Sequence, residues 1–193
     1  MYEDSIKKRI HDSLFVTETI LSNDKILSDI SEVTQELIRA FRNGKKVLFC
    51  GNGGSAADAQ HLAAELSGKF YLDRAPLFAE ALHVNTSYLT AVANDYSYEE
   101  VYERLVKAKG RRGDILVGIS TSGNSKNVIR AIKVANGIGM ITVGLTGESG
   151  GKMKDICKYL IRVPSDDTPK IQEATIMIGH IICEFVEKEL FNA

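Results

Sequence analysis

A histidine and a glutamate just after a glycine-rich turn are the residues of this chain best suited to chemistry. His61 and Glu65 are four residues apart in a segment rich in alanine and leucine, which are strong helix formers. That spacing places an imidazole and a carboxylate on the same face of one helix. Such a pair can hold a metal ion or transfer protons, although a surface helix without any chemical role can carry the same two residues.

The turn before this helix is suited to binding an anion. A short apolar run at 47–50 leads into the glycine-rich segment 51–54, and Ser55 is expected to cap the helix that follows. A strand that enters a helix through glycines directs backbone N–H groups and the positive end of the helix at one point. We therefore expect an anion to bind beside the histidine and glutamate pair.

The same turn also matches a motif of nucleotide-binding proteins. Residues 51–56, GNGGSA, fit the dinucleotide fingerprint G-x-G-x-x-A, and Asp73 follows at a distance suited to a ribose contact. Only the short run 70–72 is available as the second strand of such a fold, which makes NAD the weaker alternative. A P-loop is excluded because no Gly-Lys-Ser or Gly-Lys-Thr follows the turn.

A second loop carries an unusual number of hydroxyl groups. Residues 120–125, STSGNS, lie between an expected buried strand and an expected helix, with Lys126 directly after them. One hydroxyl would be enough to cap that helix, which is the simpler explanation of the loop. Several hydroxyls next to free N–H groups favour a phosphate monoester, because its oxygens accept several hydrogen bonds.

Composition limits the classes of protein to consider. The 193 residues are 44% hydrophobic, which is enough for one globular domain spanning 1–193. The 24 basic and 25 acidic residues leave no basic surface for nucleic acid, and no apolar run is long enough to span a membrane. Cys50, Cys157 and Cys183 lie far apart in apolar runs, so we expect reduced thiols and a cytoplasmic location.

Strands that alternate with helices predict the α/β class, with a doubly wound parallel sheet of about five strands. The expected strands are 47–50, 77–84, 114–119, 140–145 and 159–163. Expected helices include 87–94, 98–109 and a long one from Pro169 or Lys170 to Phe191. Both polar loops follow strands, and ligands of such sheets bind at the carboxyl ends of the strands.

Two further helices are expected at 3–42, before the first strand. Apolar residues recur every three or four positions, Ser22-Asn23-Asp24 separates the two helices, and Asn43-Gly44 ends the second. Because this pair is an addition to the sheet domain, we interpret it as a subunit interface. Packing of both helices against the core is the alternative.

Two polar residues of the last expected helix are ambiguous. Gln172 and His180 lie among apolar residues, so His180 can be a core histidine with a satisfied ring rather than a ligand. His11 and His83 have no comparable partners in the sequence.

Four separated motifs resemble one known family. They are CGNGGSAADAQHLAAEL, VANDYSYEEVY, GISTSGNS and DDTPKIQEATIMIGHIICE, and together the resemblance covers essentially the whole chain. The chain resembles the phosphoheptose isomerases, which belong to the sugar isomerase (SIS) domain superfamily with a flavodoxin-like sheet. The resemblance implies interconversion of D-sedoheptulose 7-phosphate and D-glycero-D-manno-heptose 7-phosphate, the first step towards activated heptose. It also implies a homotetramer with shared active sites and one zinc ion (Zn²⁺) per subunit.

The resemblance further implies roles for individual residues. Glu65 and His180 would be catalytic. The implied metal ligands are His61, Glu65, Gln172 and His180. The implied substrate contacts are Asn52, Gly53, Gly54, Ser55, Glu65, Asn94, Asp95, Ser120, Thr121, Ser122, Ser125 and Gln172. Lys69 stands where many members have arginine, and Thr175 where many have a second histidine.

Helix geometry predicts that this ligand set is shared between chains. Gln172 and His180 are eight residues apart, which is about 12 Å along a helix axis and about 80° around it. One ion would join them only with both side chains fully extended toward each other. The alternatives to the heptose enzyme are a non-catalytic SIS-domain protein of the kind that binds the replication initiator, or an isomerase of another sugar phosphate.

Overall fold

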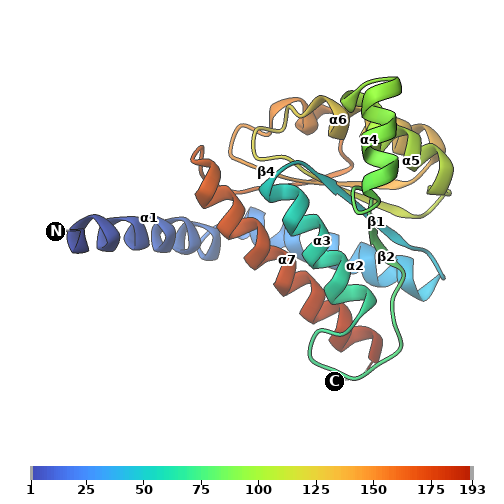
Figure 1. The fold of residues 1–193 in the computed structure, drawn as a ribbon. Helices are drawn as coiled ribbons and strands as arrows, with labels where there is room; N and C mark the ends of the chain where they lie inside the picture. The colour runs from blue at the N-terminus through green and yellow to red at the C-terminus, as the bar shows by residue number, and fades with distance from the viewer. Residues whose placement is uncertain (1, 192–193) are drawn as a thin grey trace.

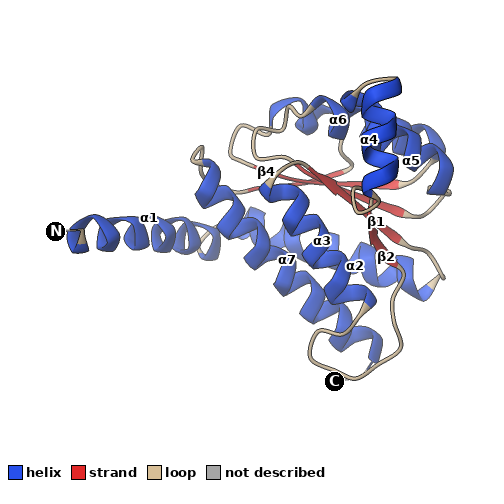
Figure 2. Ribbon diagram, in the orientation of Figure 1, coloured by secondary structure: helices blue, strands red, loops and turns tan. Residues whose placement is uncertain are grey.

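Residues 2–191 are described by a computed structural model, in which one five-stranded parallel sheet forms the centre of the molecule. The strand order is β2-β1-β3-β4-β5, which confirms the predicted doubly wound fold (Figures 1 and 2). The strands are β1 Val47–Gly51, β2 Ala79–Ala81, β3 Ile115–Ile119, β4 Ile141–Thr146 and β5 Tyr159–Arg162. Residues 1, 192 and 193 of the predicted domain lie outside the described residues.

Helices cover both faces of this sheet (Figure 1). The α-helices are α1 Glu3–Leu21, α2 Asp24–Arg42, α3 Gly54–Ser67, α4 Thr86–Asp95, α5 Val101–Lys109, α6 Lys126–Ile138 and α7 Thr168–Phe191, with 3₁₀ helices η1 Tyr98–Glu100 and η2 Gly151–Asp155. Alternate residues of β1 pack to opposite sides. Val47 and Phe49 join the core beneath α2, α3 and α7, whereas Leu48 and Cys50 join the core beneath α4, α5 and α6.

The two predicted ligand loops lie side by side. Gly51 at the end of β1 is paired with Ile119 at the end of β3, so the chain leaves both strands at the same edge of the sheet. The strand order reverses between β1 and β3, because β2 lies on one side of β1 and β4 on the far side of β3. This is the position at which doubly wound sheets bind ligands.

Three local expectations differ from the structure. The prediction that Ser55 caps its helix is wrong: α3 begins at Gly54, and Ser55 is a buried residue inside it. Gly53 takes the N-cap position instead, with a φ of +56° that glycine adopts without strain. The expected strand 77–84 pairs only over Ala79–Ala81, because β2 is an edge strand. The expected helix 98–109 begins as the 3₁₀ turn η1.

The two N-terminal helices have different environments. The side chain of Asn23 caps α2, whose apolar residues, among them Val33 and Leu37, are buried in the core beneath α3 and α7. In contrast, α1 projects from the body of the molecule (Figure 1), and Ile10 and Phe15 are among its exposed apolar residues. Core packing therefore accounts for α2, and it leaves the apolar surface of α1 unexplained.

The three cysteines, Cys50, Cys157 and Cys183, are free thiols, as predicted. Burial raises the pKa of Cys157 and Cys183 to about 12, so both stay protonated at neutral pH. Across residues 2–191, no helix has the length and apolar character needed to cross a bilayer.

Candidate functional site

The helices α3 and α7 lie side by side and run in the same direction, which brings three of the four predicted ligands together (Figure 1). Gln172 lies beside Gly54, near the start of both helices, and His180 lies opposite His61 further along. The two helices approach closely at Gly179, where a Cβ atom would lie only 2.5 Å from Leu62 Cδ2. A glycine at this position therefore allows the two histidines to meet.

Three side chains converge where these helices meet. His61 Nε2 lies 2.9 Å from His180 Nε2 and 3.2 Å from Glu65 Oε1, and one ligand atom from each residue lies within 4.8 Å of the others. The side chains of His61 and Glu65 are 49% and 25% exposed, so the cluster opens to solvent. His180 is half-buried and faces another histidine, which argues against the alternative that it is a core histidine whose ring only makes hydrogen bonds within the interior.

The donor set fits a small divalent cation such as Zn²⁺. Two imidazole nitrogens and a carboxylate oxygen are ligands that zinc prefers. Ligand atoms bound to one tetrahedral zinc at about 2.0–2.1 Å lie roughly 3.3 Å from each other. The separations of 2.9 and 3.2 Å around His61 Nε2 are close to this value, so an ion would need only small side-chain adjustments.

Gln172 lies apart from the other three proposed ligands. A Cβ atom at Gly54 would lie 2.3 Å from Gln172 Nε2, so the amide side chain occupies the space that a larger residue would take. Gly54 and His61 are seven residues apart on one helix, which is about 10 Å along its axis. The amide therefore packs at the beginning of α3, two helical turns from His61.

The serine loop after β3 presents hydroxyl groups at the edge of the sheet. Ser120 is buried, with its Oγ 2.9 Å from Ser125 Oγ, and the Ser122 hydroxyl accepts a hydrogen bond from the backbone N–H of Asn124 at 3.2 Å. Among the described residues, Ser125 stands at the N-cap of α6 without a side-chain hydrogen bond to that helix. The Ser125 hydroxyl therefore does not cap α6, and it bonds to the hydroxyl of Ser120 instead.

A cavity of about 520 Å³ adjoins this loop. It is lined by Thr121 and Ser122 after β3, by the loop after β4, and by Thr168 at the start of α7. Glu148 and Asp166 also line it, and their carboxylates can accept hydrogen bonds from the hydroxyl groups of a sugar. Lys126 lies near the loop but is paired with Glu99 at 2.8 Å, which leaves backbone N–H groups as the main source of positive potential.

The remaining predicted contacts fall into two groups. The Asn52 side chain exchanges two hydrogen bonds with that of Asn127, at 2.9 and 2.8 Å, and accepts one from the Tyr98 hydroxyl at 3.2 Å. Asn94 and Asp95 are exposed at the end of α4, where the Asn94 amide donates to Asp95 at 2.9 Å. Asn52 is thus fixed at the β1 turn, whereas the α4 pair lies on a separate surface segment.

Sequence reasoning missed several polar residues of this region. Asn127 and Tyr98 hold Asn52, although neither stands out by spacing alone. Asp58 precedes His61 by one helical turn, and its Oδ2 is buried without a partner among the described residues. Burial raises the pKa of Asp58, and the neighbouring His61 opposes this shift. Spacing on α3 is the one signal that would have drawn attention to this carboxylate.

Residues 16–147 of this chain match the sequence model of the protein family described as the SIS domain. The chain belongs to the SIS-domain family. This SIS-domain protein is 53% identical to a phosphoheptose isomerase of Clostridium acetobutylicum over 97% of this chain and 95% of the relative. It is 50% identical to a phosphoheptose isomerase of Aneurinibacillus thermoaerophilus over 98% of this chain and 96% of the relative.

Solved structures agree with the sequence relatives. The structure of a phosphoheptose isomerase from Neisseria gonorrhoeae has a TM-score of 0.91 with this SIS-domain protein, at 38% identity over 97% of this chain and all of that chain. One from Francisella tularensis has a TM-score of 0.93 at 32% identity, over 97% of this chain and 99% of that one.

The NAD alternative finds no support in this fold. Residues 70–72 form a loop rather than a strand, and Asp73 therefore does not follow a strand end as the dinucleotide fingerprint requires.

Proposed function

We propose that this SIS-domain protein is an aldose–ketose isomerase that interconverts D-sedoheptulose 7-phosphate and D-glycero-D-manno-heptose 7-phosphate. The convergence of His61, Glu65 and His180 carries the proposal, because it gives the chain acid–base groups on two helices that begin at the carboxyl edge of the sheet. Relatives that match nearly the whole chain at 50% identity or more are named phosphoheptose isomerases.

The reaction moves a proton between C1 and C2 through an enediol. Glu65 is the base that removes the proton from carbon, and His180 moves a proton between the two oxygens. The 25% exposed Glu65 side chain and the half-buried His180 face the same space, so both groups can reach adjacent atoms of one substrate. The chain of the sugar then extends toward the serine loop.

A divalent cation, which we propose to be one Zn²⁺ per subunit, completes the centre. His61, Glu65 and His180 would hold it, with Gln172 as the fourth ligand. When bound, such an ion supplies positive charge for the oxygen that becomes negative during enolisation. Because Gln172 packs against Gly54 in its own chain, we propose that subunit contacts complete the ligand set.

The serine loop anchors the phosphate at the far end of the substrate. The phosphate oxygens would accept hydrogen bonds from the hydroxyl groups of Ser120, Thr121, Ser122 and Ser125. Ser55 and the backbone of Gly53–Gly54 would lie next to them. Asn52, Asn94 and Asp95 would recognise hydroxyls between the two ends. When the phosphate at C7 is held, the length of the sugar chain places C1 and C2 at the acid–base groups. This fixed position lowers the entropic cost of the reaction.

Replacing both Ser120 and Ser122 with alanine is expected to raise KM for sedoheptulose 7-phosphate at least about tenfold, since each lost hydrogen bond to a charged group costs roughly 1.5–3 kcal/mol. Initial-rate kinetics over a range of substrate concentrations measures this effect. Ser28→Ala, on the exposed face of α2 and outside the cavity beside the serine loop, is the matched control and should leave KM within about twofold. An unchanged KM in the double variant would show that the phosphate does not bind at this loop.

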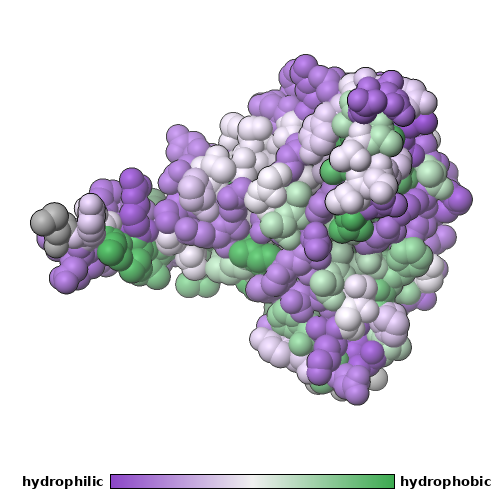
Figure 3. All heavy atoms as spheres, in the orientation of Figure 1, coloured by the Kyte–Doolittle hydropathy of each residue, from purple (hydrophilic) through white to green (hydrophobic). Residues whose placement is uncertain are grey.

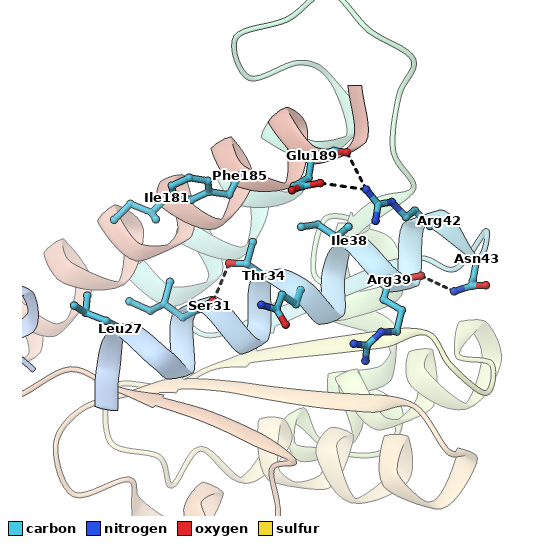
Figure 4. A pocket seen from close by; sticks show the side chains of 12 residues that line it. Leu27, Ser31, Thr34, Ile38, Arg39, Arg42, Asn43, Ile181, Phe185 and Glu189 are labelled. Atoms are coloured by element: carbon cyan, nitrogen blue, oxygen red, sulfur yellow. Dashed lines mark hydrogen bonds and ion pairs between the residues drawn. The ribbon is translucent and has the colours of Figure 1, made fainter. Parts of the chain in front are cut away.

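The exposed apolar surface of the N-terminal region supports a homo-oligomer. On α1, Ile6, Ile10 and Leu14 recur every four residues, with exposed fractions of 55%, 56% and 50%. Figure 3 shows hydrophobic atoms on this projecting helix. A groove of about 620 Å³ lies between α2 and α7, and Figure 4 shows the side chains that line it. Ile181 and Phe185 line that groove, so a second copy of this chain has an apolar surface on which to seat α1.

Replacing Leu14 with glutamate is expected to shift the protein toward smaller species, because it places a charge in the middle of the apolar surface of α1. Multi-angle light scattering measures the mass in solution. Lys8→Glu, on the exposed polar side of the same helix, changes charge without touching that surface and serves as the control. An unaltered mass for Leu14→Glu would exclude α1 from the subunit interface.

A direct assay decides between enzyme and binding protein. Purified protein should convert sedoheptulose 7-phosphate to the aldose, detected by chromatography of the product or by a coupled reaction. A non-catalytic SIS-domain protein would bind a sugar phosphate without producing the aldose. Fructose 6-phosphate and ribulose 5-phosphate serve as comparison substrates, because preferential turnover of either would assign the chain to another sugar phosphate.

A further inference from the structure

A buried ion pair ties the end of α3 to α7. The Arg74 Nε atom lies 3.3 Å from Glu187 Oε1, and both side chains are only 3% exposed. The Glu187 carboxylate also accepts hydrogen bonds from the backbone N–H groups of Phe70, Tyr71 and Leu72, at 3.1, 2.7 and 3.1 Å. Burial raises the pKa of Glu187, but these backbone donors and Arg74 outweigh it and hold the pKa below its usual value.

The same arginine satisfies the last carbonyl groups of α3. Arg74 Nη1 donates to the backbone oxygens of Leu66 at 2.8 Å and Gly68 at 3.1 Å. Its Nη2 donates to the backbone oxygen of Glu65 at 3.0 Å. Helix ends leave such carbonyls without partners, and a guanidinium with five donors can bond several of them at once. One side chain therefore joins the backbone of Glu65 to α7.

The loop held by this pair also contacts the third residue of the cluster. The ring of Phe70 lies against His180, with centroids 5.7 Å apart and an interplanar angle of 49°. Glu187 follows His180 by seven residues, about two helical turns along α7. The ion pair thus contacts the backbone of Glu65 directly, and it is linked to His180 only through Phe70, whose backbone N–H bonds Glu187.

We infer that Arg74 and Glu187 are positioning residues that fix the register of α3 against α7, so that His61, Glu65 and His180 face a common point. This inference rests on the proposed metal centre and names the interactions that hold its geometry. Buried ion pairs contribute little net stability compared with apolar side chains of similar size. The pair is therefore better explained by what it aligns than by stability alone.

Arg74→Lys and Glu187→Gln test the inference through the affinity for Co²⁺, a spectroscopic substitute for Zn²⁺. Lysine keeps the charge of Arg74 but cannot bond three carbonyls and Glu187 together. Each variant should bind Co²⁺ about tenfold to hundredfold more weakly than the wild type, as measured by chelator competition, and its visible absorption bands should shift. Measurements are made at a temperature where circular dichroism shows a folded chain.

A second buried pair provides the matched control. Lys46 and Asp114 join the beginnings of β1 and β3, at the amino edge of the sheet, and Asp114 also accepts hydrogen bonds from backbone N–H groups. Lys46→Met should lower the melting temperature and leave the Co²⁺ affinity and spectrum unchanged. This control separates loss of stability from loss of ligand alignment.

The outcomes distinguish the positioning role of the ion pair from the existence of the metal centre. Folded Arg74→Lys and Glu187→Gln variants that bind Co²⁺ with wild-type affinity and spectrum overturn the positioning role, while the metal centre stands. A wild-type protein that binds no Co²⁺ or Zn²⁺ overturns the metal centre and this inference with it. If neither substitution folds, Glu187→Asp keeps the negative charge but shortens the reach of the carboxylate to Arg74 and to the backbone N–H groups of Phe70 and Tyr71. A shifted Co²⁺ spectrum then supports the inference, and an unshifted one refutes it.

Discussion

Replacing Glu65 with glutamine is expected to lower the turnover of sedoheptulose 7-phosphate by at least about 100-fold while the chain stays folded. The amide of glutamine has nearly the shape of the carboxylate but cannot take a proton from carbon. Glu65 is 25% exposed on α3 and lies outside the apolar core, so the substitution leaves packing intact. Steady-state kinetics gives kcat, and circular dichroism verifies the fold.

Metal content must be measured in the same sample, because Glu65 is both the proposed base and a proposed ligand. A variant that retains its metal and has lost turnover assigns Glu65 to proton transfer. If activity returns with excess Zn²⁺, Glu65 acts as a ligand and another group is the base. Glu184→Gln is the control, since Glu184 lies on α7 with Lys188 as its partner at 2.6 Å and should keep full turnover.

Periodicity within one helix was the most dependable guide to this site. The spacing of His61 and Glu65 on α3 predicted that the two side chains share a face, and the structure places their atoms 3.2 Å apart. The convergence of His180 with them was not predictable from spacing, because it depends on the side-by-side packing of α3 and α7. Only the resemblance to a known family linked residues 119 positions apart in the chain.

The local errors have a common physical origin. Ser55 was expected to cap α3 from propensity, but Gly53, with its positive φ, takes the N-cap position two residues earlier and places Ser55 inside the helix. The strand at 77–84 was overestimated because sequence does not tell an edge strand from a central one. Both outcomes depend on neighbours in space rather than on neighbours in sequence.

The buried pair of Arg74 and Glu187 was likewise invisible in the sequence. The two residues are 113 positions apart, and each would ordinarily be assigned to the surface. Their burial follows from the loop after α3, whose backbone N–H groups need an acceptor once the loop folds against α7. Sequence patterns thus predicted the groups proposed to react, whereas the interactions that align them required the fold.

Removal of the proposed divalent cation is expected to lower turnover at least about 100-fold and to leave the fold largely intact. Charge stabilisation by a metal ion is worth several kcal/mol, and each 1.36 kcal/mol corresponds to tenfold in rate. The fold should survive because His61 Nε2 and His180 Nε2 lie 2.9 Å apart, so one imidazole can donate a hydrogen bond to the other. Dialysis against a chelator, followed by the isomerase assay and a thermal melt, measures both effects.

Reconstitution separates loss of the ion from damage to the protein. One equivalent of Zn²⁺ per chain should restore turnover, and a chelator saturated with Zn²⁺ beforehand should leave it unchanged. Full activity in protein shown to be metal-free would exclude the cation from the reaction and leave the acid–base pair of Glu65 and His180 to act alone. Because the two histidine nitrogens already face one another in this structure, the ligands need little rearrangement to accept the ion, and reconstitution should be rapid.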